Sequence, residues 1–418
     1  MKTYTRYKDS GISWIGKIPE HWDVKRNKIF LDEHDDTVGS RFSDFKLLSL
    51  TKQGVILRDV ESGKGKFPKD FESYKIVKKG NMIFCLFDVD ETPRTVGLSA
   101  LDGMITGAYD VFSLRKIDAR FYSYFFIAVD DRKALRPLYT GLRKVVKKDR
   151  FLSYKIPVPP LEEQRSIAAY LDKKIEQINE LVAAKQKQIE LLKEYKQSLI
   201  ANAVTKGINP KTKMKDSGIS WIGNVPEHWQ FMRAKYMFKK EKRDVRNNDE
   251  VVTCFRDGEV TLRKNRRTTG FTESLTEIGY QGIRKNDLVI HQMDAFAGAI
   301  GVSDSDGKGT SVYHCCTPLG NYNVFYYAFL LRVMAKKGFI QSLYRGIRER
   351  SSDFNFLVFG KQYLAIPPID EQKQIVAYIN ERVSSIDSQI SSIEKQIANL
   401  NEYKQSLISD VVTGKVKV

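Results

Sequence analysis

The chain has 418 residues, of which 42% are apolar and 29% are charged, and both fractions are ordinary for a folded protein with a sizeable core. At roughly 150 residues per domain, this length favours two or three domains. Its 69 Lys and Arg outnumber its 51 Asp and Glu, and the net charge of +18 favours a polyanionic partner, nucleic acid first and an anionic membrane surface second.

Neither membrane insertion nor disulfide formation is indicated by the sequence. The longest apolar stretches, such as residues 121–129, are about half as long as the roughly 20 residues of a membrane helix. The first residues lack the apolar core of a secretion signal, so we expect a cytoplasmic protein. Cys85, Cys254, Cys315 and Cys316 form no C-x-x-C pair and are predicted to be buried free thiols.

The chain opens with a segment that recurs later. Residues 8–22 read KDSGISWIGKIPEHW and residues 215–229 read KDSGISWIGNVPEHW, so that 13 of 15 positions agree. Two further pairs of segments match at nearly the same offset: PPLEEQ with PPIDEQ (159–164 and 367–372), and EYKQSLI with itself (194–200 and 402–408). These pairs indicate an internal duplication. We predict that the matched frames do one mechanical job twice, with His21 and His228 in structural roles.

The segments between the frames have diverged, and each is predicted to form a compact α+β domain. In the first, residues 23–155, short β-rich runs precede an apolar helix at 121–128. The second, residues 230–363, shows the same order, with an apolar helix at 326–335. Because the frames match while their contents differ, two different recognition surfaces on one scaffold are the expected arrangement.

A long helix is predicted after each Pro-Pro step. Proline disfavours helix for the residue before it and suits a helix that begins just beyond, where acidic residues meet the helix dipole favourably. Apolar residues then recur in steps of three and four, a period typical of supercoiled helices. The predicted seam consists of Leu171, Ile175, Ile178, Val182, Ile189, Leu192 and Leu199 in the first helix, and of Ile379, Val383, Ile386, Ile390, Ile393, Ile397, Leu400 and Leu407 in the second.

We expect these two helices to pair, because each carries one narrow apolar seam between flanks rich in Lys, Glu and Gln. The predicted fold class is α+β: two globular target-recognition domains are separated by two long helices that form an antiparallel coiled coil, with a pseudo two-fold internal duplication. A parallel pair, and separate core helices, stay open as alternatives. Lys185, Lys196 and Lys404 interrupt the seam and either fix its register or extend their amines into solvent.

The predicted domain order follows from these elements. Residues 1–158 form the first recognition domain with its repeat segment, and residues 159–207 form the first spacer helix. Residues 208–366 comprise a linker and the second recognition domain, and residues 367–418 form the second spacer helix.

Basic residues cluster in both variable segments and, together with Gln53 in a loop of the first, are the candidates for DNA contact. The candidates are Lys52, Gln53, Arg58, Arg143, Lys144, Lys147 and Lys148 in the first domain, and Arg256, Arg263, Lys264, Arg266, Arg267, Arg345, Arg348 and Arg350 in the second. Lys and Arg neutralise phosphates, while Arg, Asn and Gln discriminate base edges. Two basic modules on a spacer suit a bipartite duplex target. Solvated surfaces and ordinary hairpin turns are the simpler alternatives.

No catalytic, cofactor or metal site is predicted. The sequence has no G-x-x-x-x-G-K-[ST] loop and no G-x-G-x-x-G after a strand, and its five histidines do not fall at metal-ligand spacings. It also lacks the N-P-P-[FY] tetrapeptide with which amino-methyltransferases hold a target amine. A self-contained nuclease with an unrecognised site, and an RNA-binding coiled-coil scaffold, stay as alternatives.

The twin D-S-G-I-S-W-I-G-x-[IV]-P-E-H-W segments, the twin P-P-[LI]-x-E-Q segments and the long helices after them resemble the specificity subunit of type I restriction-modification systems, over the whole chain. The resemblance implies a non-catalytic subunit whose two domains each read half of a split double-stranded DNA site. It also implies adenine methylation and cleavage by two methylase subunits and by restriction subunits, which use S-adenosylmethionine, ATP and Mg²⁺. No membrane partner is expected. The second copy has Ala365 where the first has Lys155, and no family binding residue is carried over.

Overall fold

The computed structural model describes residues 2–58, 71–140, 144–266, 269, 279–343 and 353–418. The chain forms two compact units. Unit 1 comprises Met1–Gln186 with Glu394–Val418, and unit 2 comprises Lys187–Ile393. The predicted domains were segments along the sequence, whereas the units reflect packing: each unit contains one variable domain, the first part of its own long helix and the last part of the other helix.

A four-stranded antiparallel sheet forms the centre of unit 1. Its order is β4 (Leu31–His34), β11 (Asp110–Leu114), β8 (Met82–Phe84) and β9 (Val96–Leu98). Helix α1 (Ala119–Asp131) packs against this sheet, because its aromatic residues are buried by joining the same apolar cluster as the sheet strands. The ring of Phe126 lies 5.1 Å from that of Phe84 on β8, and both are buried.

Two-stranded antiparallel pairs and short helices complete unit 1. The pairs are β1 (Tyr7–Asp9) with β2 (Lys17–Pro19), β3 (Asp23–Arg26) with β14 (Lys155–Val158), β5 (Leu48–Thr51) with β6 (Gly54–Leu57), β7 (Lys75–Val77) with β10 (Gly103–Ile105), and β12 (Tyr139–Thr140) with β13 (Val145–Val146); the short helices are α2 (Lys148–Ser153) and the 3₁₀ turns Asn27–Ile29, Gly39–Asp44 and Arg136–Leu138. The β3–β14 pair brings the first frame to the residues that precede the long helix.

Unit 2 repeats this arrangement although its sequence has diverged. Its central sheet has the order β18 (Phe238–Glu241), β25 (Tyr313–Pro318), β22 (Leu288–His291) and β23 (Ile300–Val302), and α5 (Val324–Lys336) covers it. The remaining elements are β15 (Met214–Asp216) with β16 (Asn224–Pro226), β17 (Gln230–Arg233) with β26 (Tyr363–Ile366), β19 (Val252–Cys254) with β20 (Val260–Leu262), β21 (Gln281–Ile283) with β24 (Gly307–Gly309), the helices α4 (Ala234–Met237), α6 (Phe339–Ser342) and α7 (Phe356–Lys361), and the 3₁₀ turns Arg263–Asn265 and Ala295–Ala297. The predicted α+β class is confirmed.

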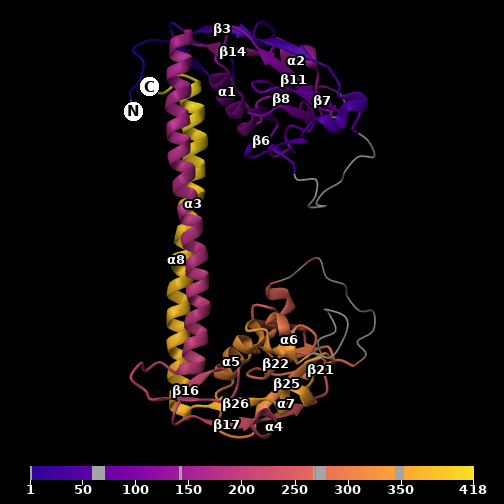
Figure 1. Cartoon of the computed structure of the whole chain (residues 1–418), viewed down its shortest axis with the longest axis vertical. Coiled ribbons are helices and arrows are strands. Elements are labelled where there is room, and N and C mark those ends of the chain that lie inside the picture. The colour runs from indigo at the N-terminus through magenta and orange to yellow at the C-terminus, as the bar shows by residue number, and fades with distance from the viewer. Residues whose placement is uncertain (1, 59–70, 141–143, 267–268, 270–278, 344–352) are drawn as a thin grey trace. The chain divides into compact units, whose positions relative to one another are not determined.

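The long helices are α3 (Leu161–Lys206) and α8 (Ile369–Val412), and they lie side by side (Figure 1). Every residue of the predicted seam is buried or half-buried. Within unit 1, Lys185 Nζ donates to Gln396 Oε1 at 2.5 Å, and Lys404 Nζ donates to Asn179 Oδ1 at 3.0 Å. Numbers rise along α3 as they fall along α8, so the helix segments run antiparallel there.

The seam lysines all reach a polar atom on the facing helix. In unit 2, Lys196 Nζ lies 2.5 Å from Asp387 Oδ1. Lys196 and Lys404 hold the same place in the two EYKQSLI segments, and their acceptors, Asp387 and Asn179, are also one repeat apart. Each lysine therefore replaces an apolar contact by a polar bond between the helices. A polar residue in such a seam sets the register of the two helices.

The last turns of each long helix pack into the core of a unit: those of α8 in unit 1 and those of α3 in unit 2. In unit 1, Leu407 and Val411 of α8 join the cluster that contains the fully buried Trp22. In unit 2, Val204 of α3 joins the cluster that contains Trp229. The chain then turns at a glycine with positive φ, at Gly414 (φ 73°) in unit 1 and at Gly207 (φ 72°) in unit 2. Such a backbone favours glycine because it has no Cβ.

All four cysteines are buried and free. Along the described residues, no helix combines the length and the apolar character that crossing a membrane requires.

We predict that Gly414→Ala destabilises unit 1 more than Gly16→Ala does. Both glycines have a φ near +73°, so each alanine costs about 1 kcal/mol in backbone strain. A Cβ at Gly414 would also meet Pro19 Cδ at 2.3 Å, whereas a Cβ at Gly16 meets nothing within 4 Å. The steric overlap adds about 1–3 kcal/mol. Urea unfolding followed by tryptophan fluorescence measures the difference, and equal losses would contradict the close packing at Gly414.

Candidate DNA-recognition site

The matched sequence segments meet at the start of each long helix and form what we call the joint: the P-E-H-W motif, the Pro-Pro step and the first turn of the helix. In unit 1, His21 Nε2 lies 2.9 Å from Glu163 Oε2. In unit 2, His228 Nε2 lies 2.8 Å from Glu371 Oε2. The two frames thus build the same contact from residues more than 140 positions apart, which explains why the motifs occur together in each copy.

Sequence reasoning did not identify the buried glutamines of the joint. Gln164 and Gln372 follow the glutamates that contact His21 and His228, and both side-chain amides are buried. Each amide bonds to the backbone beside the helix that packs on the central sheet. The signal in the sequence was the E-Q step shared by the two copies, but no spacing rule gives its partners.

In unit 1, the predicted contact residues Lys52 and Gln53 lie at the exposed tip of the β5–β6 hairpin. Thr51 Oγ1 accepts a hydrogen bond from the Gln53 backbone N–H at 3.1 Å, and Gly54 has a φ of 100°. The tight turn therefore projects both side chains from the hairpin. Arg58 is half-buried just beyond β6.

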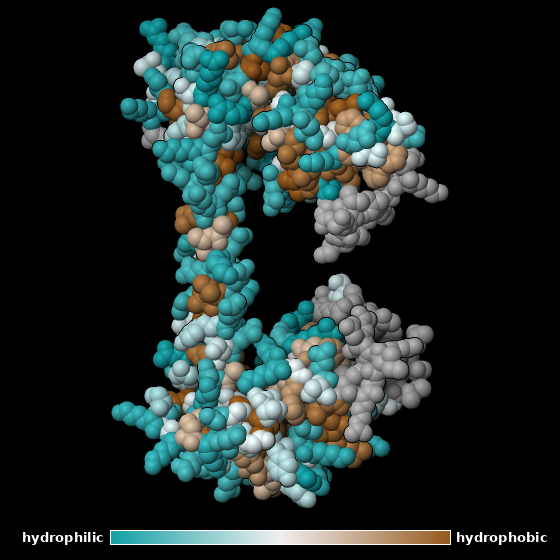
Figure 2. Space-filling view, in the orientation of Figure 1, coloured by the Kyte–Doolittle hydropathy of each residue, from teal (hydrophilic) through white to brown (hydrophobic). Residues whose placement is uncertain are grey.

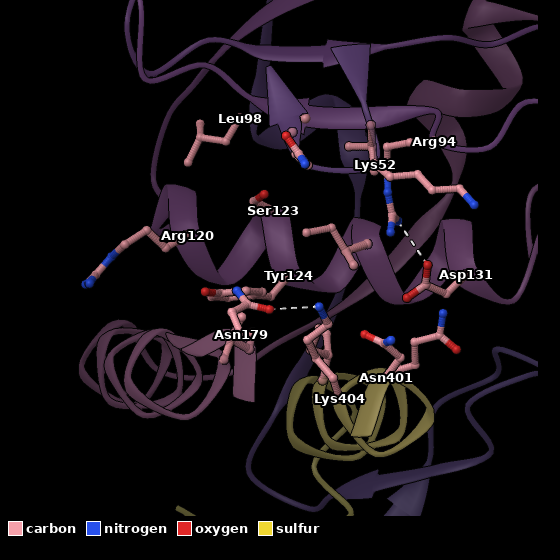
Figure 3. A pocket seen from close by; sticks show the side chains of 18 of the residues that line it. Lys52, Arg94, Leu98, Arg120, Ser123, Tyr124, Asp131, Asn179, Asn401 and Lys404 are labelled. Atoms are coloured by element: carbon pink, nitrogen blue, oxygen red, sulfur yellow. Dashed lines mark hydrogen bonds and ion pairs between the residues drawn. The ribbon is translucent and has the colours of Figure 1, made fainter. Parts of the chain in front are cut away.

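The hairpin tip borders a cavity of about 1070 Å³, the unit 1 cavity, whose other walls are α1, α3 and α8 (Figure 3). Figure 3 shows Arg94 directed toward Asp131, with 3.0 Å between Nη1 and Oδ1. Arg120 Nη1 lies 2.7 Å from Asp172 Oδ2, and Tyr124 donates to the other oxygen of that carboxylate. The cations that line this cavity are thus largely held by carboxylates within the domain.

The later basic residues of unit 1 are only partly free. Lys144 Nζ contacts Glu91 and lies 3.6 Å from Asp90 Oδ2. These carboxylates raise the pKa of Lys144, so its amine stays charged. Lys148 is half-buried and contacts Glu33, whereas Lys147 is exposed. Arg143 lies outside the described residues.

In unit 2, the hairpin β19–β20 carries arginines that pair with nearby carboxylates. Arg266 Nη1 lies 2.8 Å from Asp257 Oδ2 and 2.7 Å from Glu259 Oε2, and its guanidinium stacks 4.2 Å from the Phe255 ring centroid. The side chain is thus fixed in one orientation on the hairpin.

Two neighbouring cations of unit 2 are paired in the same way. Arg256 Nη2 lies 3.0 Å from Asp294 Oδ1, and Lys264 Nζ lies 2.6 Å from Glu250 Oε2. Exposed ion pairs of this kind contribute roughly 0–1 kcal/mol, so another anion can replace the carboxylate at small cost. Arg263 is half-buried in the turn after β20. Arg267, Arg345, Arg348 and Arg350 lie outside the described residues.

The comparisons with known proteins agree with this fold and its repeats. Residues 72–191 match the family model of the type I restriction modification DNA specificity domain. A putative type I restriction enzyme MjaX specificity subunit of Methanocaldococcus jannaschii is 21% identical, over 97% of this chain and 96% of its own length. The chain is thus similar over nearly its whole length to a specificity subunit of a type I restriction enzyme, and part of it matches the DNA specificity domain.

Two solved structures share the fold of this chain. The HsdS subunit from Thermoanaerobacter tengcongensis is similar at a TM-score of 0.54 and 14% identity, over 96% of this chain and 98% of its own. A chain from work on complex assembly and conformational transition of the type I R-M system gives a TM-score of 0.66 at 15% identity, over 96% and 99%.

Specificity subunits of type I restriction-modification complexes form a non-catalytic family. In the described part of the chain, the His, Cys, Asp and Glu side chains form no group that could hold a metal ion. The comparisons, rather than this absence, favour DNA specificity over the nuclease alternative raised by the sequence.

We predict that unit 2 loses stability as the pH falls from about 6.5 toward 4, because His314 is only 3% exposed and its ring nitrogens have no partner among the described residues. Burial, then Lys240, lowers the pKa of His314 to about 4, against the weaker opposite effect of Asp353. The unfolded chain therefore takes up the proton first, and unit 2 loses about 1–2 kcal/mol by pH 5.

Hydrogen exchange of β22 and β25 between pH 7.5 and 5 measures this loss, with β8 and β11 of unit 1 as the internal reference. His314→Leu should flatten the pH dependence of unit 2. An unchanged pH dependence in that variant would show that another group is responsible.

Proposed function

We propose that this specificity subunit recognises a bipartite site in double-stranded DNA, with one half-site read by each variable domain. The observation that carries the proposal is a scaffold built twice from matched frames around domains of different surface chemistry. If both half-sites had the same sequence, two domains with the same surface would be sufficient. The net charge of +18 supplies the attraction to phosphate, and the domains supply the discrimination.

The equivalent hairpins of the two domains support different half-sites. β5–β6 presents Lys52 and Gln53 at its tip, whereas β19–β20 presents Asp257 and Gly258 next to the fixed guanidinium of Arg266. A lysine or arginine favours guanine and a glutamine favours adenine in the major groove, so the two tips suit different bases. We place Lys52, Gln53 and Arg266 among the residues that approach the duplex.

We further propose that two methylase subunits dock on this chain and methylate adenine in the two half-sites, and that restriction subunits join them for cleavage. S-adenosylmethionine, ATP and Mg²⁺ would be used by these partners. Tyr195 and Tyr403 support two equivalent docking points: their side chains are 57% and 45% exposed, and each lies in an EYKQSLI segment. Core packing does not explain an exposed tyrosine kept in both copies, and tyrosine is enriched in protein interfaces.

Figure 2 shows that hydrophilic residues cover most of the visible surface of the two long helices. Small hydrophobic patches lie among these hydrophilic residues. Such isolated apolar side chains on a polar helix can anchor a partner, because most of the binding energy of an interface comes from a few buried residues.

Exchange of one variable domain should change one half of the methylated sequence. Residues 23–155 would be replaced by the matching segment of a relative that reads another sequence, and the methylated motif would be determined by sequencing host DNA. Because each domain contacts its own half-site, the other half should stay the same. Exchange of residues 230–363 is the matched control and should alter only the second half. A change in both halves, or in neither, would exclude the modular reading.

Tyr195→Ala and Tyr403→Ala should each weaken the binding of one methylase subunit by about 30-fold, the effect of removing an interface anchor. The bound complex would fall from two methylase subunits to one at limiting concentration, measured by light scattering. Leu191→Ala is the control: Leu191 is 52% exposed, but the equivalent residue of the other helix is Asn399. Unchanged stoichiometry in both tyrosine variants would place the docking surface elsewhere.

A further inference from the structure

In unit 1, the buried side-chain amide of Gln164 joins the long helix α3 to α1, the helix that packs against the central sheet of the variable domain. Gln164, in the first turn of α3, is 2% exposed. Its Nε2 donates to the Pro159 carbonyl at 2.8 Å, and its Oε1 accepts from the Asp118 backbone N–H at 2.8 Å. Asp118 in turn caps α1, because its carboxylate accepts from the first amides of that helix. The amide thus bridges the starts of the two helices.

The same bridge occurs in unit 2. Gln372 is 1% exposed; its Nε2 donates to the Pro367 carbonyl at 2.8 Å, and its Oε1 accepts from the Asn323 backbone N–H at 2.9 Å. Asn323 caps α5 as Asp118 caps α1. Helices α1 and α5 differ at nearly every aligned position. The two copies therefore share the hydrogen-bonded bridge although the sequences of the helices have diverged.

The position requires one donor and one acceptor at the same time. An amide provides both, whereas a carboxylate provides only acceptors and a leucine provides neither. A carbonyl and an N–H at this buried position would each lose a partner in those variants, which is costly because solvent reaches the position poorly. The histidine–glutamate contact beside it is exposed and therefore holds the joint less firmly.

A small change of angle at this joint has a large effect at the DNA surface. A rotation of about 10° moves an atom roughly 20 Å from the pivot by about 3.5 Å, close to the rise of one base pair, about 3.4 Å. The helix α1 packs against the central sheet, so the sheet and its hairpins move with it.

We propose, on the basis of the two-half-site function above, that Gln164 and Gln372 are positioning residues: their amide bridges set the angle of each variable domain on its long helix, and this angle selects the number of base pairs between the two half-sites. The residues act through the backbone of α1 and α5 and do not touch DNA.

The test uses the assembled complex with its methylase subunits and DNA whose half-sites are separated by the natural gap, by one base pair more or by one less. Wild type should bind the natural gap best. Gln164→Leu should lose about tenfold at the natural gap and less at the altered gaps, so that the preference flattens. Gln177→Leu, an exposed glutamine on the same helix, is the matched control and should keep the wild-type preference.

Gln164→Glu separates hydrogen bonding from packing. As a neutral acid it has one donor and one acceptor, and as a carboxylate it has no donor, so gap selection should return as the pH is lowered from 8 to 6. Asp118, Glu162 and Glu163 flank the position and would raise the pKa of the new acid. His21 contacts Glu163 beside this position, so wild type and Gln164→Leu are measured at each pH as references.

A measurement without DNA completes the test. Loss of the bridge should speed hydrogen exchange at the Asp118 amide and in the first turn of α1, while the sheet strands keep their protection. Gln372→Leu should do the same at Asn323 and α5. If wild type itself shows no gap preference, the bipartite function fails. If wild type selects the gap and Gln164→Leu lowers binding equally at all gaps, the glutamine is merely structural and the positioning role is overturned.

Discussion

A helix with one narrow apolar seam is stable in water only when that seam is covered, and in this chain α3 and α8 cover each other. The burial of Ile178, Ile189, Ile386 and Ile393 along the seam is the contact on which both units depend. The antiparallel direction brings the end of each helix to the frame of the opposite half. The two frames can then have nearly the same sequence, because each packs against an equivalent helix end.

The sequence predicted those features that are set by local periodicity and by self-similarity. The duplication, the two long helices and their seam could be read directly, because a 3.5-residue period and repeated motifs need no knowledge of distant partners. The divergent domains were predicted only as α+β. Their shared strand order could not be read, since pairings such as Ile83 with Val111 and Val289 with Cys315 depend on packing between segments of unlike sequence.

The candidate site was predicted less completely than the fold. Charge clusters located Lys144 and Arg266, but their carboxylate partners Glu91 and Asp257 are determined by the folded domains. The bridge formed by Gln164 spans 46 residues and ends on a backbone amide, for which no side-chain pattern exists. Long-range polar contacts of this kind require the tertiary structure, even where the residues that make them lie in a recognisable motif.

The internal ion pairs of the recognition hairpins affect how this cationic chain meets arbitrary DNA. Arg256, Lys264 and Arg266 already contact carboxylates, so a phosphate must displace an existing partner before it gains the cation. In the function that we propose, a sequence that offers only charge exchanges one ion pair for another and returns little net free energy, whereas a matched half-site adds base-edge bonds. Under that proposal, an excess of positive charge is compatible with low occupancy of unrelated DNA, because the acidic residues among the basic ones already pair with them.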